Sequence, residues 1–221
     1  MKVGLRVSHP RVSDLAFSLI SPEGTRTVLV ENRGGTNRTA LGYEEVVTNF
    51  HHVALTYRTN TGLATLYLDG VPQGQRDIGS FAPDTRHHLF LGRQTVTNVA
   101  FAAQYLGQLD EVDLYGRALE PAEILGIYRY GGAAKPTNAL VSRWSFDGNG
   151  ADVMGNHPAG IDGPTFVPGK FGLGLDFARI GDFVIVTNAP GLDVGLRSGF
   201  TIDAWVNPRR PQHQPHPRDL G

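Results

Sequence analysis

The feature that most constrains this chain is a pair of short segments in which apolar and polar residues alternate on either side of a turn. Residues 52–57 (HVALTY) alternate, Asn60-Thr61-Gly62 supplies a turn, and residues 63–68 (LATLYL) alternate again before Asp69-Gly70, a hairpin dipeptide. Alternation with a period of two gives a strand one face toward the core and one toward solvent. We therefore expect these two segments to pair as antiparallel strands.

The same signal recurs along most of the chain, so we expect an all-β fold. Further strands are expected at residues 5–7, 15–19, 28–30, 88–92, 107–115, 141–146, 174–177, 183–186 and 200–206. The 28 glycines and 14 prolines fit many short strands joined by tight turns. One helix is expected at residues 121–130, because Pro121 suits a first helical turn and Gly131 follows the last.

Charge and composition exclude several classes of function. Lys and Arg number 20 against 21 Asp and Glu, so the net charge of -1 gives no strong field for nucleic acid or an anionic membrane. No apolar run approaches the roughly 18 residues that span a bilayer, and we expect no membrane insertion. The absence of cysteine excludes a disulfide framework and a cysteine nucleophile. Residues 1–10 lack an apolar signal-peptide core, so we expect any secretion signal to lie upstream.

Changes of pattern divide the chain into sections. We expect a first β segment at residues 1–45, a second section at 46–132 and a third at 139–207. Residues 133–138 (AAKPTN) are polar and contain proline, which is typical of a linker. The tail at 208–221 (PRRPQHQPHPRDLG) cannot build a core, and we expect it to be disordered.

The second section carries a series of motifs in a fixed order. These are residues 50–57 (FHHVALTY), 66–70 (LYLDG), 89–92 (LFLG) and 107–112 (GQLDEV), the last followed by Tyr115, 117–119 (RAL) and Glu123-Ile124. In this order they resemble the C-terminal half of a laminin-G-like jelly roll, although Phe50 stands where that family usually has tryptophan. The resemblance implies an antiparallel β-sandwich of the concanavalin-A-like type.

The third section resembles the N-terminal half of the same family. Its matching segments are residues 144–149 (WSFDGN), Asp152 with Gly155-Asn156, 169–177 (GKFGLGLDF), 182–184 (DFV) and 200–206 (FTIDAWV). Half a jelly roll alone would leave an apolar face and strand edges exposed. We therefore expect both sections to form one sandwich in circularly permuted order; the alternative is two separate partial sheets with frayed edges. Four aromatic residues of the third section should then pack against the second: Trp144, Phe146, Phe177 and Trp205 against Val53, Leu55, Leu66, Leu68 and Leu91.

The first section resembles a different family. Residues 8–15 (SHPRVSDL), 19–25 (LISPEGT) and 32–35 (NRGG) are similar to the P-domain that accompanies subtilisin-like proprotein convertases. We expect residues 1–45 to form a partial P-domain-like β segment.

The concanavalin-A-like fold also includes glycoside hydrolases, so one acidic motif has to be weighed. A glycanase family of this fold uses Glu-x-Asp-x-x-Glu, and here Glu111 and Asp113 fit the first two positions while Gly116 occupies the third. Such enzymes need two carboxyl groups about 5 Å apart across the scissile bond. With one of them missing there is no proton donor, and we expect no enzymatic activity.

Three polar residues in a glycine-rich loop form a candidate calcium site. Asp147, Asn149 and Asp152 offer the oxygen ligands that calcium prefers, and Asp110 is a further candidate by position. The resemblance supports this, because related lectin folds often hold a calcium ion. The alternative is that these side chains form local hydrogen bonds in turns.

Adjacent histidines form two pairs, His51 with His52 and His87 with His88. Neighbouring residues on a strand point to opposite faces, so neither pair can hold one metal ion through both rings. A cross-pair of His52 with His88 would need strands that the sequence does not place side by side.

Aromatic residues are candidates for stacking on a sugar ring. Trp144 and Trp205 lie in alternating apolar strands, where an aromatic side chain is more often part of the core. Tyr43 and Tyr105 fall in loops and are candidates for exposure, but no feature distinguishes either as a ligand contact.

The resemblance implies a non-catalytic carbohydrate- or protein-binding module with a role in adhesion, part of a larger secreted or cell-surface mosaic protein. Its expected partner is a glycan or an extracellular protein, and its expected cofactor is calcium or none. The alternatives are a structural spacer without ligand and a glycoside hydrolase of the same fold.

Overall fold

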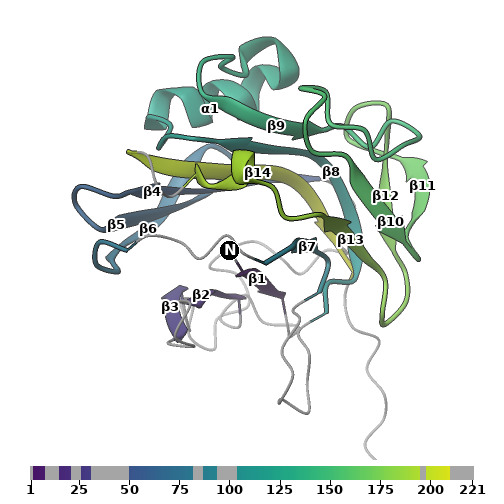
Figure 1. Ribbon diagram of the computed structural model, residues 1–221, viewed down its shortest axis with the longest axis horizontal. Helices are drawn as coiled ribbons and strands as arrows, with labels where there is room; N and C mark the ends of the chain where they lie inside the picture. The colour runs from purple at the N-terminus through teal and green to yellow at the C-terminus, as the bar shows by residue number, and fades with distance from the viewer. Residues whose placement is uncertain are drawn as a thin grey trace, which may run out of the picture.

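The computed structural model describes residues 50–81, 87–93, 104–194 and 198–209 in full, and three N-terminal strands by their backbone. A large antiparallel sheet of eight strands has the order β11-β12-β8-β14-β4-β5-β6, and β9 also pairs with β8 (Figure 1). The strands of this sheet are β4 (His51–Arg58), β5 (Leu63–Leu68), β6 (Val71–Asp77), β8 (Gly107–Tyr115), β9 (Leu140–Trp144), β11 (Thr165–Pro168), β12 (Leu173–Phe177) and β14 (Gly199–Pro208).

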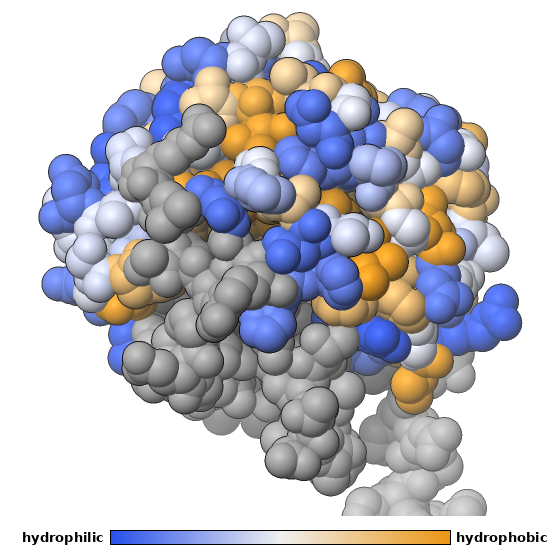
Figure 2. Space-filling model, viewed as in Figure 1, coloured by the Kyte–Doolittle hydropathy of each residue, from blue (hydrophilic) through white to orange (hydrophobic). Residues whose placement is uncertain are grey.

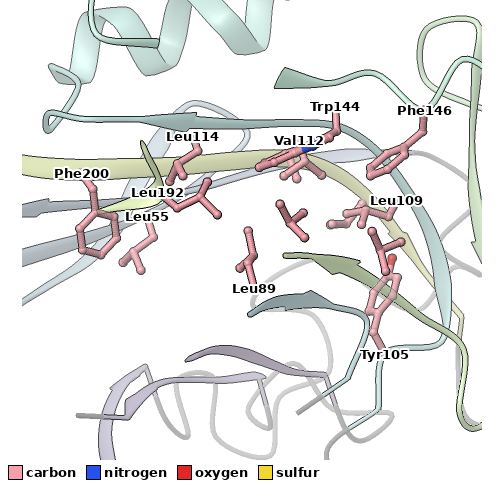
Figure 3. Packing of buried hydrophobic residues seen from close by; sticks show 14 of the residues in the cluster. Leu55, Leu89, Tyr105, Leu109, Val112, Leu114, Trp144, Phe146, Leu192 and Phe200 are labelled. Atoms are coloured by element: carbon pink, nitrogen blue, oxygen red, sulfur yellow. The ribbon is translucent and has the colours of Figure 1, made fainter. Parts of the chain in front are cut away.

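A smaller sheet lies against one face of the large one, and the two together form a sandwich (Figure 1). Its order is β10-β13-β7, with bounds Ala159–Asp162, Phe183–Val186 and Leu89–Leu91. The main core lies between the two sheets, as Figure 3 shows for Leu55, Trp144 and Leu89. We call the face of the large sheet toward this core its inner face.

The first section forms a three-stranded antiparallel sheet of its own, with the order β1-β2-β3. The strands are β1 (Lys2–Val7), β2 (Leu15–Ile20) and β3 (Arg26–Val30), close to the expected positions. Their backbone agrees with a β segment, and whether it is P-domain-like stays a prediction.

The second and third sections are interleaved in one sandwich, as expected for the permuted order. β14, from the third section, lies between β4 and β8 of the second and pairs with both. β9 and β12 also pair with β8, and β13 pairs with β7. Phe146 and Phe177 join the same core cluster as Leu55. One expected contact is wrong: Trp205 points away from this cluster, because Ala204 and Val206 on either side of it face inward.

A β-bulge in β8 determines which acidic residues share a face. Asp203 pairs with Asp113 and Trp205 pairs with Asp110, and the register shifts between these two pairs. Glu111 lies at the bulge with a φ of 52°. A bulge adds one residue to one strand, so residues three apart can point the same way. Asp110 and Asp113 therefore both lie on the outer face of the sheet.

The expected helix is present as α1 (Pro121–Tyr130), and it covers the outer face of the large sheet (Figure 1). Its start is stabilised by a capping box between Glu120 and Glu123. A second, smaller apolar cluster forms beneath it from Ala54, Tyr67, Tyr115, Leu119, Ile124 and Ile127. No helix in the part of the chain described by the structure is long and apolar enough to cross a membrane.

Two boundary predictions need correction. Residues expected as a linker instead continue from α1 as a short 3-10 helix (Gly131–Ala134), and the Lys135 side chain that follows is completely buried. The expected tail begins too early, since β14 includes Pro208 and Arg209 forms an ion pair with Asp176. Residues 210–221 lie outside the described part of the chain.

Candidate functional site

A pair of buried carboxylates lies at the centre of the outer face. Asp113 on β8 and Asp203 on β14 are opposite each other, with exposed fractions of 0% and 1%. The His52 Nε2 atom on β4 lies 3.2 Å from Asp203 Oδ1. Burial raises the pKa of Asp203, His52 opposes this shift, and Asp113 adds to it. A polar group is thus contributed by each of three adjacent strands.

Two cations neutralise Glu111 and Asp113 on β8. Lys135 Nζ lies 2.6 Å from Glu111 Oε2 and 3.1 Å from Asp113 Oδ2. Arg143 Nε, on β9, donates to Asp113 Oδ1 at 3.0 Å. Burial acts to lower the pKa of Lys135, but Asp113, Asp203 and Glu111 outweigh it and hold the pKa above its usual value. We call Glu111, Asp113, Lys135, Arg143 and Asp203 the charged cluster.

The charged cluster contains the acidic motif that was compared with a glycosidase site. A retaining enzyme holds its two carboxyl groups on either side of the bond that it cleaves. Here one lysine ammonium lies within hydrogen-bonding distance of both Glu111 and Asp113. Gly116 supplies no third carboxylate, as expected. The absence of enzymatic activity stays a prediction, and the geometry favours it.

Beside the charged cluster, three side chains form a row across three strands. His52 on β4 pairs with Trp205 on β14, which pairs with Asp110 on β8. We call these three residues the transverse row. All are buried, with exposed fractions of 0%, 1% and 0%. The prediction that Trp205 is buried is confirmed, as it is for Trp144, whose Nε1 donates to the His157 carbonyl at 2.7 Å.

The central tryptophan of the row is surrounded by rings and by one cation. The Trp205 ring centroid lies 5.3 Å from that of His52, 5.9 Å from that of Tyr128 on α1 and 5.8 Å from that of Phe171. Lys170 Nζ lies 4.4 Å from the Trp205 ring centroid, a cation–π distance. Tyr128 and Phe171 are partly exposed, so the side chains that cover Trp205 also form part of the molecular surface.

Asp110 holds the turn that carries this cover. Its Oδ2 accepts a hydrogen bond from the Phe171 backbone N–H at 3.0 Å, while Oδ1 has no partner. Burial raises the pKa of Asp110 to about 6, and the bond from Phe171 opposes that shift.

Turn hydrogen bonds occupy the residues expected to bind calcium. Asp147 Oδ1 accepts from Leu173 N–H and Asn149 Oδ1 from Ala151 N–H, both at 2.8 Å. The carboxylate of Asp152 accepts from four backbone N–H groups, those of Arg143, Met154, Asn156 and His157.

These carboxyl groups are not brought together as a ligand set. Asp110 and Asp147 both reach the turn at 169–173, while Asp152 binds a different loop. Among the described residues there is no group of three or more His, Asp and Glu side chains that could hold a metal ion. The residues present therefore do not fit a calcium site, and calcium binding stays a prediction.

The adjacent histidines contact separate groups, as expected. His51 Nδ1 lies 2.7 Å from Asp69 Oδ2, whereas His52 contacts Asp203. His88 Nδ1 accepts from the Asn188 N–H at 2.9 Å. Tyr105 is not exposed as expected: it is buried, and its hydroxyl donates to the Gln108 carbonyl at 2.6 Å. Tyr43 lies outside the described residues.

The sequence did offer a signal for part of this site. Asp203 is the one charged residue in the strand expected at residues 200–206, and an acidic residue there has to find a buried partner. No sequence signal pointed to Lys135, because it lies in a short polar segment with proline, residues 133–138, that is typical of a linker.

A scan against protein families supplies the identity of the fold. Residues 11–125 match the laminin-G model of the concanavalin A-like lectin/glucanases superfamily. The match includes residues 11–45, for which we expected a P-domain-like segment, and no comparison supports that resemblance. Searches of curated proteins and of solved structures gave no match. The sandwich of antiparallel sheets agrees with the family match, which spans more than half of the chain, so this protein belongs to the laminin-G-like group of the concanavalin A-like lectin/glucanase superfamily.

Proposed function

We propose that this chain is a non-catalytic binding module of a larger secreted or cell-surface protein, and that it recognises a glycan or an extracellular protein in adhesion. Membership of the laminin-G-like family supports a binding role. The form of the charged cluster is the observation that argues against catalysis. Glu111 and Asp113, the two residues of the glycanase-like motif, are paired with Lys135 and Arg143, so they are not free to act as nucleophile or proton donor.

An aromatic surface on the outer side of the large sheet supports the binding role. Tyr128 and Tyr130 near the end of α1 are 38% and 68% exposed, and Phe171 in the β11–β12 turn is 39% exposed. Phe171 lies against Gly131, so the turn and the end of α1 form one surface. On the face of the molecule that Figure 2 shows, apolar residues lie in patches between polar ones. Aromatic side chains with a polar atom are favoured in both sugar and protein recognition.

A glycan array, run with and without calcium, tests the proposal. We expect binding to at least one glycan, and we expect the double variant Tyr130→Ala and Phe171→Ala to lose it. Ile180→Ala is the matched control, since Ile180 is apolar and 88% exposed but is not one of the residues of the aromatic surface. Absence of binding to the array and to candidate extracellular proteins would favour a structural spacer.

A second assay addresses catalysis. We expect no release of reducing sugar from β-glucan or related polysaccharides by the parent chain. Hydrolysis that Glu111→Gln abolishes would overturn the non-catalytic proposal.

A further inference from the structure

The transverse row combines an aromatic ring with polar atoms that have no partner. His52, Trp205 and Asp110 are aligned by the register of β4, β14 and β8. His52 Nδ1, Trp205 Nε1 and Asp110 Oδ1 are all buried, and none makes a hydrogen bond. Asp203 Oδ2, next to His52, is a fourth such atom. Buried polar atoms in folded proteins nearly always have a partner, so four without one in adjacent residues point to a missing ligand or water.

The cover over this row is built from side chains that can move. Lys170 is exposed, and Phe171 is 39% exposed. The turn that carries both is closed by the bond from Gly169 N–H to the Gly172 carbonyl at 3.0 Å, and Gly172 has a φ of 59°. A long lysine side chain changes rotamer readily. Removing Lys170 from the Trp205 ring breaks no strand pairing, because β12 begins at Leu173.

The unpartnered atoms match the chemistry of sugar hydroxyls. Asp110 Oδ1 and Asp203 Oδ2 accept hydrogen bonds, Trp205 Nε1 donates one, and a hydroxyl can do either. His52 Nε2 faces Asp203 Oδ1, which leaves Nδ1 for a further bond. A pyranose ring also offers C–H groups for packing on an indole face. The two carboxylates disfavour an acidic sugar.

We propose that the transverse row is a covered carbohydrate subsite, which binds one neutral pyranose residue on Trp205 when the side chains of Lys170, Phe171 and Tyr128 move aside. This inference rests on the proposed binding function and assigns it a place and a ligand class. Asp110 has two roles in it: Oδ2 holds the turn through Phe171, and Oδ1 binds a hydroxyl group.

The chain contains two tryptophans, which provides an internal reporter. In Trp144→Phe only Trp205 fluoresces, and in Trp205→Phe only Trp144 does. We would titrate each with methyl glycosides of glucose, galactose, mannose and N-acetylglucosamine up to about 50 mM, which covers millimolar Kd values. We expect at least one glycoside to change the emission of the Trp144→Phe variant and none to change that of Trp205→Phe. Saturation-transfer NMR on the unaltered chain provides the same test if Trp144→Phe fails to fold.

Two further variants separate the subsite from general surface binding. Lys170→Ala removes part of the cover, and we expect the Kd to fall about threefold. Asp110→Asn loses a charged acceptor, and we expect the Kd to rise about tenfold. Arg129→Ala, on exposed α1 surface, should leave the Kd unchanged.

The possible failures can be distinguished. Glycan-array binding that persists in Trp205→Phe and Asp110→Asn would leave the proposed function standing and overturn the subsite. If no glycoside changes Trp205 emission, even in the Trp144→Phe and Lys170→Ala double variant, the unpartnered atoms bind only water and the subsite is again overturned. Failure of the unaltered chain on the array would count against glycan recognition itself.

Discussion

The two faces of the large sheet are built from the same strands but differ in character. The inner face contributes apolar side chains such as Phe177, Phe200 and Leu175, all with exposed fractions of 0%. The outer face combines the apolar cluster beneath α1 with the buried polar side chains of Asp113, Asp203 and His52. Period-two alternation in β8 and β14 sends one set of residues to each side.

We interpret this difference as a division between a face that contributes mainly stability and a face that contributes mainly specificity. On the inner face, the stabilising free energy scales with the apolar area removed from water, so it does not depend on one specific partner for each residue. The outer face depends on individual partners, because an unpaired buried charge is strongly unfavourable. Replacing a buried charged cluster with apolar residues is often neutral for stability, so the cluster is better evidence of specificity than of stability. The following predictions test this comparison, from the largest effect to the smallest.

Removing a large inner-face side chain should have the greatest effect. Phe177→Ala leaves a cavity beside Tyr105, whose ring centroid is 5.7 Å away, and should lower the free energy of unfolding by about 4–5 kcal/mol. Chemical denaturation measures this. Phe166→Ala is the control, since Phe166 is 39% exposed, and should change stability by less than about 1 kcal/mol. Equal losses in the two variants would contradict the assignment of the main core.

Breaking the charged cluster should have the next largest effect. Lys135→Met leaves Asp113 buried with Arg143 as its remaining cation, and should cost about 3 kcal/mol. Adding Glu111→Gln and Asp113→Asn should recover much of that loss, because the uncompensated charges are then gone. Arg129→Met, at an exposed cation on α1, is the matched control. A Lys135→Met variant as stable as the parent would show that the ion pairs contribute nothing.

Replacing the Asp110 carboxylate on the outer face with an uncharged amide should stabilise the protein. Burial raises the folded-state pKa of Asp110 to about 6 from 3.8, so the folded state binds a proton more tightly than the unfolded chain. The free energy of unfolding therefore falls as pH rises between these values, and the loss is complete above about pH 6. Asp110→Asn removes this loss, and should gain about 1 kcal/mol at pH 7.5, or about 2–4 °C in Tm.

That gain should disappear on acidification. At pH 4 most of the parent chain already carries a proton on Asp110, so thermal unfolding should give the same Tm for parent and variant. A gain that is independent of pH would show that ionisation of Asp110 is not its cause.

Calcium should have the smallest effect. Since Asp147, Asn149 and Asp152 already accept backbone hydrogen bonds, we expect the Tm in millimolar calcium to equal that in chelator within about 1 °C. A site occupied at about 100 times its Kd would instead add roughly 2.7 kcal/mol. Such a rise would show that the loops rearrange to bind the ion.

Much of the fold could be predicted because alternation and turn residues are local signals. Residues 107–115 and 121–130 were placed with the bounds that the structure shows. β6 was missed because its sequence, VPQGQRD, is polar and contains proline and glycine, which suits only an edge strand. Strands β10 and β11 are four residues each, too short for alternation to stand out.

The candidate site was harder to predict because it depends on register. Glu111 and Asp113 were recognised as a pair from the sequence. The bulge that places Asp110 on the same face as Asp113 has no sequence signal. Nor could spacing show that Trp205 lies between His52 and Asp110, since those residues come from different sections of the chain. The four aromatic residues were correctly expected to be buried. Trp205 was expected to pack in the core on the inner face, but it lies on the outer face.

The position of β14 has a consequence for synthesis on the ribosome. Asp203 on this strand contacts His52, 151 residues earlier, so the middle of the large sheet stays open until nearly the whole described chain has emerged. Until then β4 and β8 each present an unpaired edge, which favours strand capture by a neighbouring chain. Contacts of such high sequence separation also slow folding. A nascent chain of this design therefore exposes these strand edges for longer than one whose neighbouring strands are close in sequence.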